Sequence, residues 1–439
     1  MQYLLTTIAL IFFLSTQLSA RQADTVTAKG DYLNGQKHGR WHEYDSNGQL
    51  KAVGDYKNGL KTNIWNYYYP GKVLKEIVSY EEDQKNGKYA IFDSTGLLIR
   101  ETNYLKDKLN SYYLEYYENG NLALKGYHKN NIKDSIWVEY QPNGYKTFIE
   151  EYKNGLPNGE WVLFYENGNL KSIENYKNGI EHGNWRIFYE FPQIWKDFYF
   201  KNGDIDSTYV EFHKNGVKSV IGQYKDDFKD GTWRNYYPDG KLYSIGKYQN
   251  DFKTNIWKYF DDNGLLDEEG PFKADMRNGQ WIEYYPSGAI SQVGVYINDE
   301  KDGLWGLFHE NEQLMQEQKW QNGRLIEVGP YYGPAGNTFP KSNFNNGNGE
   351  LITYHGNGNI RSKVRYENGR AEGKYDSYYE DGTVSETGNM VNGKKSGKWT
   401  TFHSNGKISS LGEYKNDEKT GRWRFYNRRG RLSEAVSFQ

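Results

Sequence analysis

The chain has 439 residues, no cysteine and a formal net charge of −2, from 55 Lys and Arg against 57 Asp and Glu. The lack of a basic excess argues against a nucleic-acid partner, and the lack of cysteine excludes disulfides and thiolate metal sites. Aromatic residues make up 17% of the chain and Gly contributes 48 residues, whereas all hydrophobic types together reach only 36%. This composition favours strands and turns over a thick aliphatic core and predicts a thin sheet.

The first 20 residues are predicted to be a secretory signal peptide. An uncharged apolar run from Tyr3 to Leu14 is followed by polar residues and by Leu18-Ser19-Ala20 before Arg21, which is the order of a signal peptide cleaved after Ala20. The apolar run is short for a transmembrane helix. We therefore expect an exported chain that is periplasmic, associated with the outer membrane or extracellular, with an uncleaved N-terminal anchor as the alternative.

From Trp41 onward the chain is an internal repeat. Sixteen of seventeen segments have Trp, Tyr or Leu at one position, called position 0, every 24 residues except for one step of 22, and all seventeen have Tyr or Phe at +3. Such a period is typical of solenoids and extended arrays, in which each unit packs on its neighbours. Position 0 is held by Trp41, Trp65, Tyr89, Tyr113, Trp137, Trp161, Trp185, Tyr209, Trp233, Trp257, Trp281, Trp305, Gly329, Leu351, Tyr375, Trp399 and Trp423.

Each repeat is interpreted as two short strands separated by turns. Gly is at +7 in fourteen of seventeen repeats, and Gly, Asn or Asp is at +18 in all sixteen repeats that include this position. These residues adopt positive φ most readily, as tight hairpin turns require, so the Asp residues at +18 are interpreted as turn residues and not as metal ligands. The sequence predicts an all-β fold, an extended antiparallel array of about 17 β-hairpin repeats in a single-layer ribbon or solenoid.

A third aromatic row is at +15, where only His128 and Met390 depart from Tyr, Phe or Trp. Residues three apart in a strand point to opposite faces, so positions 0 and +3 cannot share a face unless a bulge intervenes. We expect either aromatic rows on both faces or one face covered by another element. Apolar surface left open would mark a contact surface for a partner, whereas rings that bury one another would not.

Two stretches depart from the repeat pattern. Residues 324–349 form a degenerate repeat with a two-residue deletion, which predicts a kink between an N-terminal repeat array, residues 21–323, and a C-terminal one, residues 350–439. Residues 189–199 replace the turn Gly with Pro192 and add Trp195, which is either a binding spot or a repacked hairpin. The last repeat ends at Phe438, so its strand is a sheet edge through which self-association can occur.

No pattern for catalysis stands out. His213, His309, His355 and His403 all occupy position +4, and repeats of two strands place them about 10 Å or more apart, too far for shared metal ligation. The chain has no Gly-rich phosphate loop and no nucleophile elbow. We expect no enzymatic activity, no catalytic residues, no cofactor and no metal.

The repeat unit Trp-x-x-Tyr/Phe, then Asn-Gly-x-Leu, then Gly-x-Tyr-x-Asn-Gly, then Gly two residues before the next Trp, resembles the MORN-repeat variant family, which includes bacterial antitoxin-like proteins. The resemblance covers residues 30–439. It implies an extended antiparallel ribbon of hairpins that contacts proteins or membrane surfaces without catalysis. An antitoxin role implies a cytoplasmic protein, whereas residues 1–20 predict export.

The chain also resembles, less closely, the choline- and glucan-binding repeats of secreted bacterial proteins, as in Trp65-Asn66-Tyr67-Tyr68-Tyr69. These repeats imply open aromatic cages between neighbouring hairpins, suited to a sugar or a quaternary ammonium group. The first hypothesis is an exported scaffold that binds a protein or the envelope surface, the alternative is a carbohydrate- or choline-binding module, and the second alternative is an antitoxin- or immunity-like inhibitor. The candidate binding residues are Trp65, Tyr68, Tyr69, Trp161, Tyr165, Trp185, Trp195, Trp233, Trp257 and Trp281.

Overall fold

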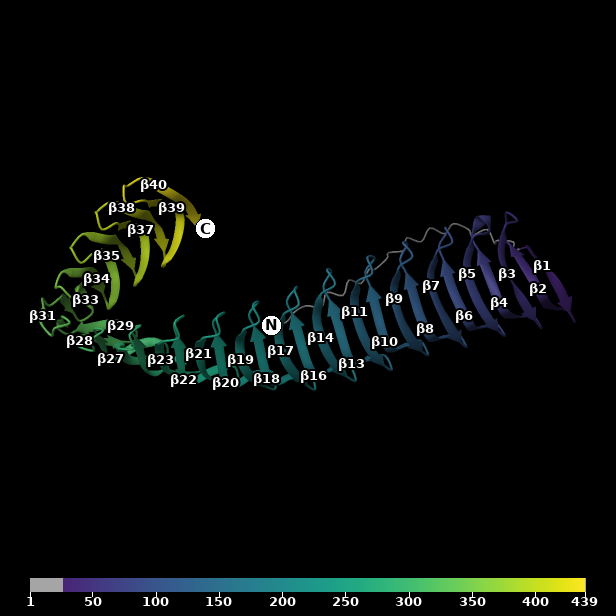
Figure 1. The fold of residues 1–439 in the computed structure, drawn as a ribbon, viewed down its shortest axis with the longest axis horizontal. Coiled ribbons are helices and arrows are strands. Elements are labelled where there is room, and N and C mark those ends of the chain that lie inside the picture. The colour runs from purple at the N-terminus through teal and green to yellow at the C-terminus, as the bar shows by residue number, and fades with distance from the viewer. Residues whose placement is uncertain (1–26, 439) are drawn as a thin grey trace. The chain divides into compact units, whose positions relative to one another are not determined.

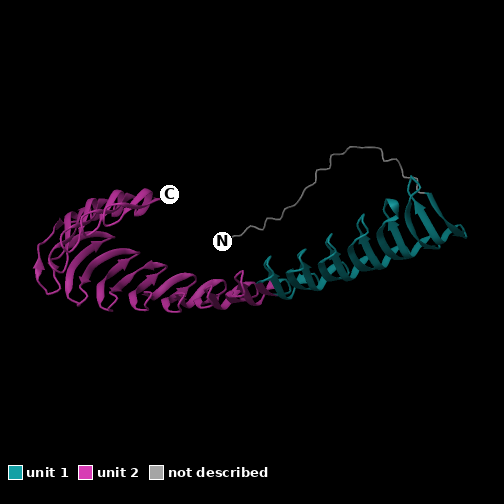
Figure 2. Ribbon diagram, turned by 45° about the horizontal axis from the view of Figure 1, so that its top comes forward, with its two compact units in different colours: residues 1–170, 176–179 teal, residues 171–175, 180–439 magenta. Residues whose placement is uncertain are grey.

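The computed structural model describes residues 27–438, so the predicted signal peptide lies outside the described residues. The chain forms two compact units: unit 1 extends to residue 170 and includes 176–179, and unit 2 comprises 171–175 and 180–439 (Figure 2). The described part contains strands and a single 3₁₀ turn, η1 (Pro70–Lys72). None of its segments forms a helix long and apolar enough to cross a bilayer.

Unit 1 consists of antiparallel strands that pair in chain order (Figure 1). They are β1 (Thr27–Leu33), β2 (Gln36–Tyr44), β3 (Leu50–Lys57), β4 (Leu60–Tyr68), β5 (Leu74–Glu81), β6 (Gln84–Phe92), β7 (Leu98–Leu105), β8 (Lys108–Tyr116), β9 (Leu122–Lys129), β10 (Ile132–Tyr140), β11 (Lys146–Lys153), β12 (Leu156–Pro157) and β13 (Gly159–Phe164). Strand β14 (Leu170–Lys177) has residues of both units.

Unit 2 repeats the same antiparallel pattern up to β29 and resumes it from β32. The first set is β15 (Ile180–Glu181), β16 (Gly183–Phe188), β17 (Ile194–Lys201), β18 (Asp204–Phe212), β19 (Lys218–Lys225), β20 (Phe228–Tyr236), β21 (Leu242–Gln249), β22 (Phe252–Phe260), β23 (Leu266–Lys273), β24 (Met276–Arg277), β25 (Gly279–Tyr284), β26 (Ile290–Ile297), β27 (Glu300–Phe308), β28 (Leu314–Gln321) and β29 (Arg324–Val328). The second set is β32 (Asn343–Asn345), β33 (Asn348–Tyr354), β34 (Ile360–Glu367), β35 (Arg370–Tyr378), β36 (Val384–Val391), β37 (Lys394–Phe402), β38 (Ile408–Lys415), β39 (Glu418–Tyr426) and β40 (Leu432–Phe438).

The all-β hairpin-repeat fold predicted from the sequence is confirmed in both units. Most repeats have a wider turn that ends at a Gly at position +7, and a tight turn follows at +17 and +18. In the first, the Gly48 N–H donates to the Asp45 carbonyl at 3.0 Å, with Gly48 at a φ of 75°. In the second, Asn58 and Gly59 both have positive φ, 52° and 80°, as a two-residue hairpin turn requires.

Positions 0 and +3 lie on opposite faces of the sheet. Glu43 pairs with Ala52 but Tyr44 pairs with Leu50, so the extra residue, Lys51, bulges on the returning strand and not between Trp41 and Tyr44. The strand from position 0 to +3 is therefore regular and its side chains alternate. We call the two sides the Trp face and the Tyr face.

A second bulge precedes position 0. Val53 pairs with Asn66 and Asp55 with Thr62, so residues 63–65 oppose the single residue Gly54. Asn63, two residues before Trp65, has a φ of 58°, in the left-handed region that Gly and Asn tolerate best. This bulge carries the Trp65 ring over Gly54 on the preceding strand.

The regular pairing of unit 2 is interrupted between β29 and β32. Strands β30 (Tyr331–Tyr332) and β31 (Thr338–Phe339) form a separate two-stranded sheet. Single backbone hydrogen bonds join the hairpin turns that flank the interruption: Gly347 N donates to the Ile326 carbonyl at 2.9 Å, Gly369 N to the Gly347 carbonyl at 2.7 Å, and Leu325 N to the Gly369 carbonyl at 3.0 Å. A Cβ on Gly369 would lie 2.6 Å from the Arg324 Cβ, so this stacking of turns requires Gly.

Candidate functional site

The Trp side chains at position 0 form the core. Nine of them are at most 2% exposed: Trp41, Trp65, Trp137, Trp233, Trp257, Trp281, Trp305, Trp399 and Trp423. Each indole N–H donates to the backbone carbonyl ten residues earlier, as Trp257 does to Lys247 at 3.2 Å and Trp305 to Val295 at 3.1 Å. The polar edge of the ring is therefore satisfied inside the repeat.

A Gly eleven residues earlier makes room for each of these nine Trp rings. A Cβ added to Gly246 would overlap the Trp257 ring, and the same holds for the other eight pairs. The two remaining Trp residues at position 0 are Trp161 and Trp185, which are only half-buried. Eleven residues before them the Gly is replaced by Glu150 and Glu174. Where position 0 is Tyr, a larger residue replaces the Gly, for example Val78 before Tyr89 and Thr102 before Tyr113.

The aromatic residues at 0 and +15 interlock into an aromatic ladder on the Trp face. From Tyr224 to Trp305 the centroids of successive rings are 5.0–6.2 Å apart, with interplanar angles of 76–86°. This edge-to-face geometry is the favoured one for aromatic pairs, and it leaves no open cage between repeats. The ladder runs through Tyr224, Trp233, Tyr248, Trp257, Phe272, Trp281, Tyr296 and Trp305.

A cationic side chain four residues before position 0 covers each step of the ladder. The Lys253 Nζ lies 4.6 Å from the Trp257 ring centroid and 4.9 Å from that of Phe272, and the Lys301 Nζ lies 3.8 Å from that of Trp305. Burial lowers the pKa of both lysines. The place that a ligand cation would take over the rings is occupied by the protein's own ammonium groups.

Side chains at +4 and +18 join neighbouring repeats. The Tyr237 hydroxyl donates to the Phe260 carbonyl at 2.9 Å, and the His213 Nε2 lies 2.8 Å from the Tyr236 carbonyl. A carbonyl can only accept, so the imidazole donates from Nε2, and His at +4 replaces Tyr in the same bond. At +18, the Asp275 Oδ1 accepts the Lys253 backbone N–H at 2.6 Å. Residues 27–438 hold no group of three or more His, Cys, Asp or Glu suited to a metal ion.

The structure does not bring the candidate binding residues together. Trp65, Trp233, Trp257 and Trp281 are buried in the core, so their ring faces are not open to a ligand. Tyr69 donates its hydroxyl to the Phe92 carbonyl at 3.2 Å. Half-buried positions are held by Tyr68, Trp161, Tyr165 and Trp185.

Trp195 differs from the other candidates because 39% of its surface is exposed. Its ring stacks on Tyr189, with centroids 5.7 Å apart, and the Lys196 Nζ lies 4.7 Å from its centroid. This places Trp195 in a local aromatic cluster of the irregular hairpin at 189–199.

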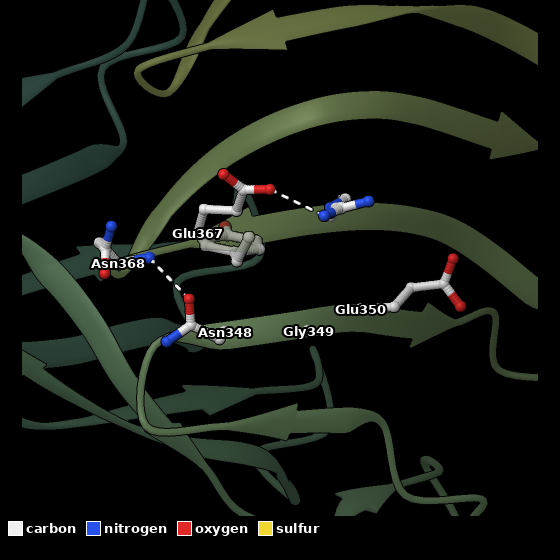
Figure 3. A pocket seen from close by; sticks show the side chains of 7 residues that line it. Asn348, Gly349, Glu350, Glu367 and Asn368 are labelled. Atoms are coloured by element: carbon white, nitrogen blue, oxygen red, sulfur yellow. Dashed lines mark hydrogen bonds and ion pairs between the residues drawn. The ribbon is translucent and has the colours of Figure 1, made fainter.

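None of the residues that line the three cavities around the interruption of unit 2 is among the binding residues predicted from the sequence, although Tyr375 and His355 hold repeat positions 0 and +4. The one in Figure 3 has a volume of about 560 Å³; in it the Asn368 N–H donates to the Asn348 Oδ1 at 3.0 Å, and the Arg365 guanidinium pairs with Glu367 at 2.8 Å, while Glu350 projects from the neighbouring strand. Burial raises the pKa of Tyr366 in the same wall. A second cavity, of about 610 Å³, contains Glu300 beside Arg324 and Arg370.

The third cavity, of about 450 Å³, is lined largely by hydroxyl and amide side chains. Thr353 and Ser362 line one part and Ser377 and Ser385 another. The signal for this region in the sequence is the loss of Trp at three successive positions 0, Gly329, Leu351 and Tyr375.

Rows of side chains that recur every 24 residues in a single-layer antiparallel sheet define a β-hairpin repeat protein. The family described as MORN repeat variant matches seven segments, residues 37–58, 109–130, 157–178, 229–250, 277–298, 347–368 and 395–416. The chain is therefore a MORN-repeat protein of the variant type. Repeats of this kind suggest a repeat-type protein-binding module.

No curated protein matches the chain. Similar solved structures include the TcdB2-TccC3 complex, at 12% identity over 90% of this chain and 26% of that chain with a TM-score of 0.15. They also include a Photorhabdus luminescens Tc holotoxin pore, at 12% identity over 91% of this chain and 26% of that chain with a TM-score of 0.15. This chain thus spans about a quarter of the length of those chains.

Proposed function

We propose that the chain is an exported, non-enzymatic scaffold that binds a protein partner at the cell envelope through the Tyr face of its sheet. The observation that carries this proposal is a row of exposed apolar side chains on that face of unit 2. Ile256, Val295 and Leu304 are 58%, 37% and 60% exposed. We call this the apolar row.

The apolar row lies on the Tyr face because each of its members is next in sequence to a residue whose side chain belongs to the Trp face. Ile256 directly precedes Trp257, and Leu304 directly precedes Trp305, so their side chains point away from the ladder. Across the hairpins, Ile256 pairs with Pro271, Gln280 with Val295, and Leu304 with Lys319. These pairs place apolar and polar side chains side by side over β22 to β28.

A surface of this kind suits a protein partner. Exposed apolar side chains mixed with polar ones are the composition of a protein-binding patch, and the Trp face offers no comparable apolar surface because rings and lysines cover it. The same arrangement weighs against the choline-binding alternative, since an ammonium ligand needs an aromatic cage that Lys253 and Lys301 already fill.

Affinity capture from solubilised cell envelope tests the proposal. The wild-type chain is expected to retain one protein in stoichiometric amount, and Ile256→Glu with Leu304→Glu is expected to abolish retention because charges are costly in an apolar contact. Thr232→Glu is the matched control, because Thr232 holds the same repeat position before Trp233 but is polar. Retention that is equal in all three would contradict the assignment of the surface, and recovery of a toxin would favour the inhibitor role.

The export part of the proposal has a separate test. Fractionation of cells that produce the full chain is expected to place it in the periplasm, the outer membrane or the medium, with Arg21 as its N-terminal residue. A cytoplasmic chain that retains Met1 would contradict export and would restore the antitoxin-like role as an option.

A further inference from the structure

The aromatic ladder of unit 2 stops after Trp305, and the cavity of about 450 Å³ lies on the side of the sheet where it would continue. The cavity is lined at position +2 by Thr353 and Ser377 and at position +11 by Ser362. These positions lie on the Trp face, because successive side chains of a strand alternate between the two faces. In the regular repeats this face is closed by a Trp ring and its lysine. Here position 0 is Gly329, Leu351 and Tyr375. Leu351 is buried in a cluster with Leu325, Val328 and Phe344, and the cavity is lined mainly from positions +2, +10 and +11.

Bulged residues deliver side chains into this cavity. Thr353 pairs with Ser362 but Tyr354 pairs with Ile360, which leaves Arg361 outside the pairing, and Ser385 is left out in the same way between Glu386 and Val384. Both residues line the cavity. A bulge re-aims the side chain that it carries, so the repeat geometry itself places Arg361 at this wall.

The hydroxyl groups of the wall occur as hydrogen-bonded pairs. The Thr353 Oγ1 lies 2.7 Å from the Ser362 Oγ, and the Ser377 Oγ lies 2.8 Å from the Ser385 Oγ. One hydroxyl of each pair donates to the other, so every pair keeps one donor and several acceptor lone pairs for a further group. A ligand rich in hydroxyl groups can use both.

Charge separates this cavity from its two neighbours. Its lining includes Arg361 and no Asp or Glu, whereas in the cavity of Figure 3 Arg365 is paired with Glu367. Arg361 is exposed and has no ion-pair partner within residues 27–438. An unpaired guanidinium is a fork of donors that fits a carboxylate.

We propose that this cavity binds a carboxylated sugar, namely a uronic acid unit of an acidic polysaccharide. The carboxylate pairs with Arg361, the ring hydroxyls exchange hydrogen bonds with the Thr353–Ser362 and Ser377–Ser385 pairs, and the half-buried Tyr375 offers a ring to the apolar side of the sugar. This site lies on the Trp face and is distinct from the apolar row.

Titration calorimetry of the full chain with a galacturonic acid trimer tests the site, with maltotriose as the neutral sugar and inorganic phosphate as the plain anion. The uronate trimer is expected to bind at least about tenfold more tightly than either, because it alone offers both a carboxylate for Arg361 and ring hydroxyls for the Ser and Thr pairs. Arg361→Gln is expected to remove this preference. Arg365→Gln, on the same strand but outside the cavity wall, is the matched control and is expected to bind as the wild type does.

Three results would overturn the inference: no saturable binding of the uronate trimer, binding that Arg361→Gln leaves unchanged, or phosphate binding as tight as that of the trimer. The third would make the cavity a simple anion site. Arg361→Gln is also expected to leave capture of the envelope protein unchanged, so failure of this site and failure of the proposed scaffold function are told apart.

Discussion

The repeats that begin at Trp233, Trp257 and Trp281 and the segment from Gly329 to Tyr375 share one pattern of hairpins but have different interiors. In the first region each Trp ring lies over a Gly and under a lysine or an arginine, with its indole N–H bonded inside the repeat. In the second region no Trp–Gly pair exists among the positions 0, a smaller buried cluster of Leu325, Val328, Phe344 and Leu351 replaces the Trp rings, and polar cavities lie around the interruption. The tightly closed interior and the cavities thus lie in different repeats of the same unit.

The largest expected effect comes from removing a ring of the closed region. Trp257→Ala is expected to cost about 3–5 kcal/mol, because deletion of a large buried aromatic leaves a cavity that cannot collapse. Tyr375→Ala is expected to cost less, since Tyr375 is only half-buried and lines the cavity of about 450 Å³. Hydrogen exchange of the amides in β22 and β35 measures each local opening energy, which suits an array that does not unfold as one unit. Equal losses at the two sites would contradict the division into closed and open regions.

The second expected effect concerns the Gly beneath the ring. Gly246→Thr is expected to destabilise its repeat by about 1–3 kcal/mol because the added side chain overlaps the Trp257 ring. Combining it with Trp257→Tyr is expected to restore part of the loss, since Thr102 and Tyr113 stand at these two positions in a repeat of unit 1. Urea unfolding followed by Trp fluorescence, together with local hydrogen exchange, compares the variants. If the double variant loses as much unfolding free energy as the two single variants added together, the pairing of these two positions would be refuted.

A smaller effect is expected from the bond between repeats at +4, which both regions use. Tyr237→Phe and His355→Phe each remove one hydrogen bond to a carbonyl of the next repeat and are expected to cost about 0.5–1.5 kcal/mol. Tyr237→His is expected to cost less, because His213 makes this bond in the preceding repeat. Hydrogen exchange of the amides near Phe260 and Tyr378 measures the local opening free energy in each variant. A Tyr237→His variant as unstable as Tyr237→Phe would contradict the prediction.

The period and the turn residues were sufficient to predict the fold, because both are local: every +18 position is Gly, Asn or Asp, the residues that adopt the positive φ of a tight hairpin turn most readily. The sequence places four His residues at the single repeat position +4, but their bond to the next repeat is seen only in the structure. Exposure of the Trp rings could not be read from the pattern, because the same alternation fits a closed ladder and an open cage.

Two signals for the closed ladder were present in the sequence. Gly occurs eleven residues before nine of the eleven Trp residues at position 0 and before none of the others at that position, and Lys or Arg stands four residues before most of these Trp residues. In both the Gly–Trp and the cation–Trp contacts, the bulge before position 0 changes the spacing of the two residues. Neither strand alternation nor helical spacing therefore reveals these contacts. The cavities at 324–385 depend on how three successive repeats lacking Trp stack, which a single repeat does not encode.

The smallest expected effect concerns a repeat in which a His residue replaces the aromatic residue at +15. His128 takes the aromatic place at +15 in unit 1, with its ring 4.8 Å from that of Trp137, its Nδ1 buried without a partner, and its pKa lowered by burial and by Lys133. Above the usual pKa of 6.5 the ring is neutral in both folded and unfolded chains. As the pH falls below that value the unfolded chain binds the proton first, so the folded repeat loses stability until the pH passes the lowered pKa.

His128→Tyr restores the residue found at +15 in most repeats and is expected to remove this loss of stability below pH 6.5, while Lys133→Met, which removes the smaller cause of the pKa shift, is expected only to weaken it. Hydrogen exchange of β9 and β10 at pH 7 and pH 5 measures the difference, after correction for the intrinsic pH dependence of exchange. If wild type and His128→Tyr lose the same stability between these pH values, protonation of His128 does not destabilise its repeat. A charged ring at +15 would then be tolerated beside Trp137, against this prediction.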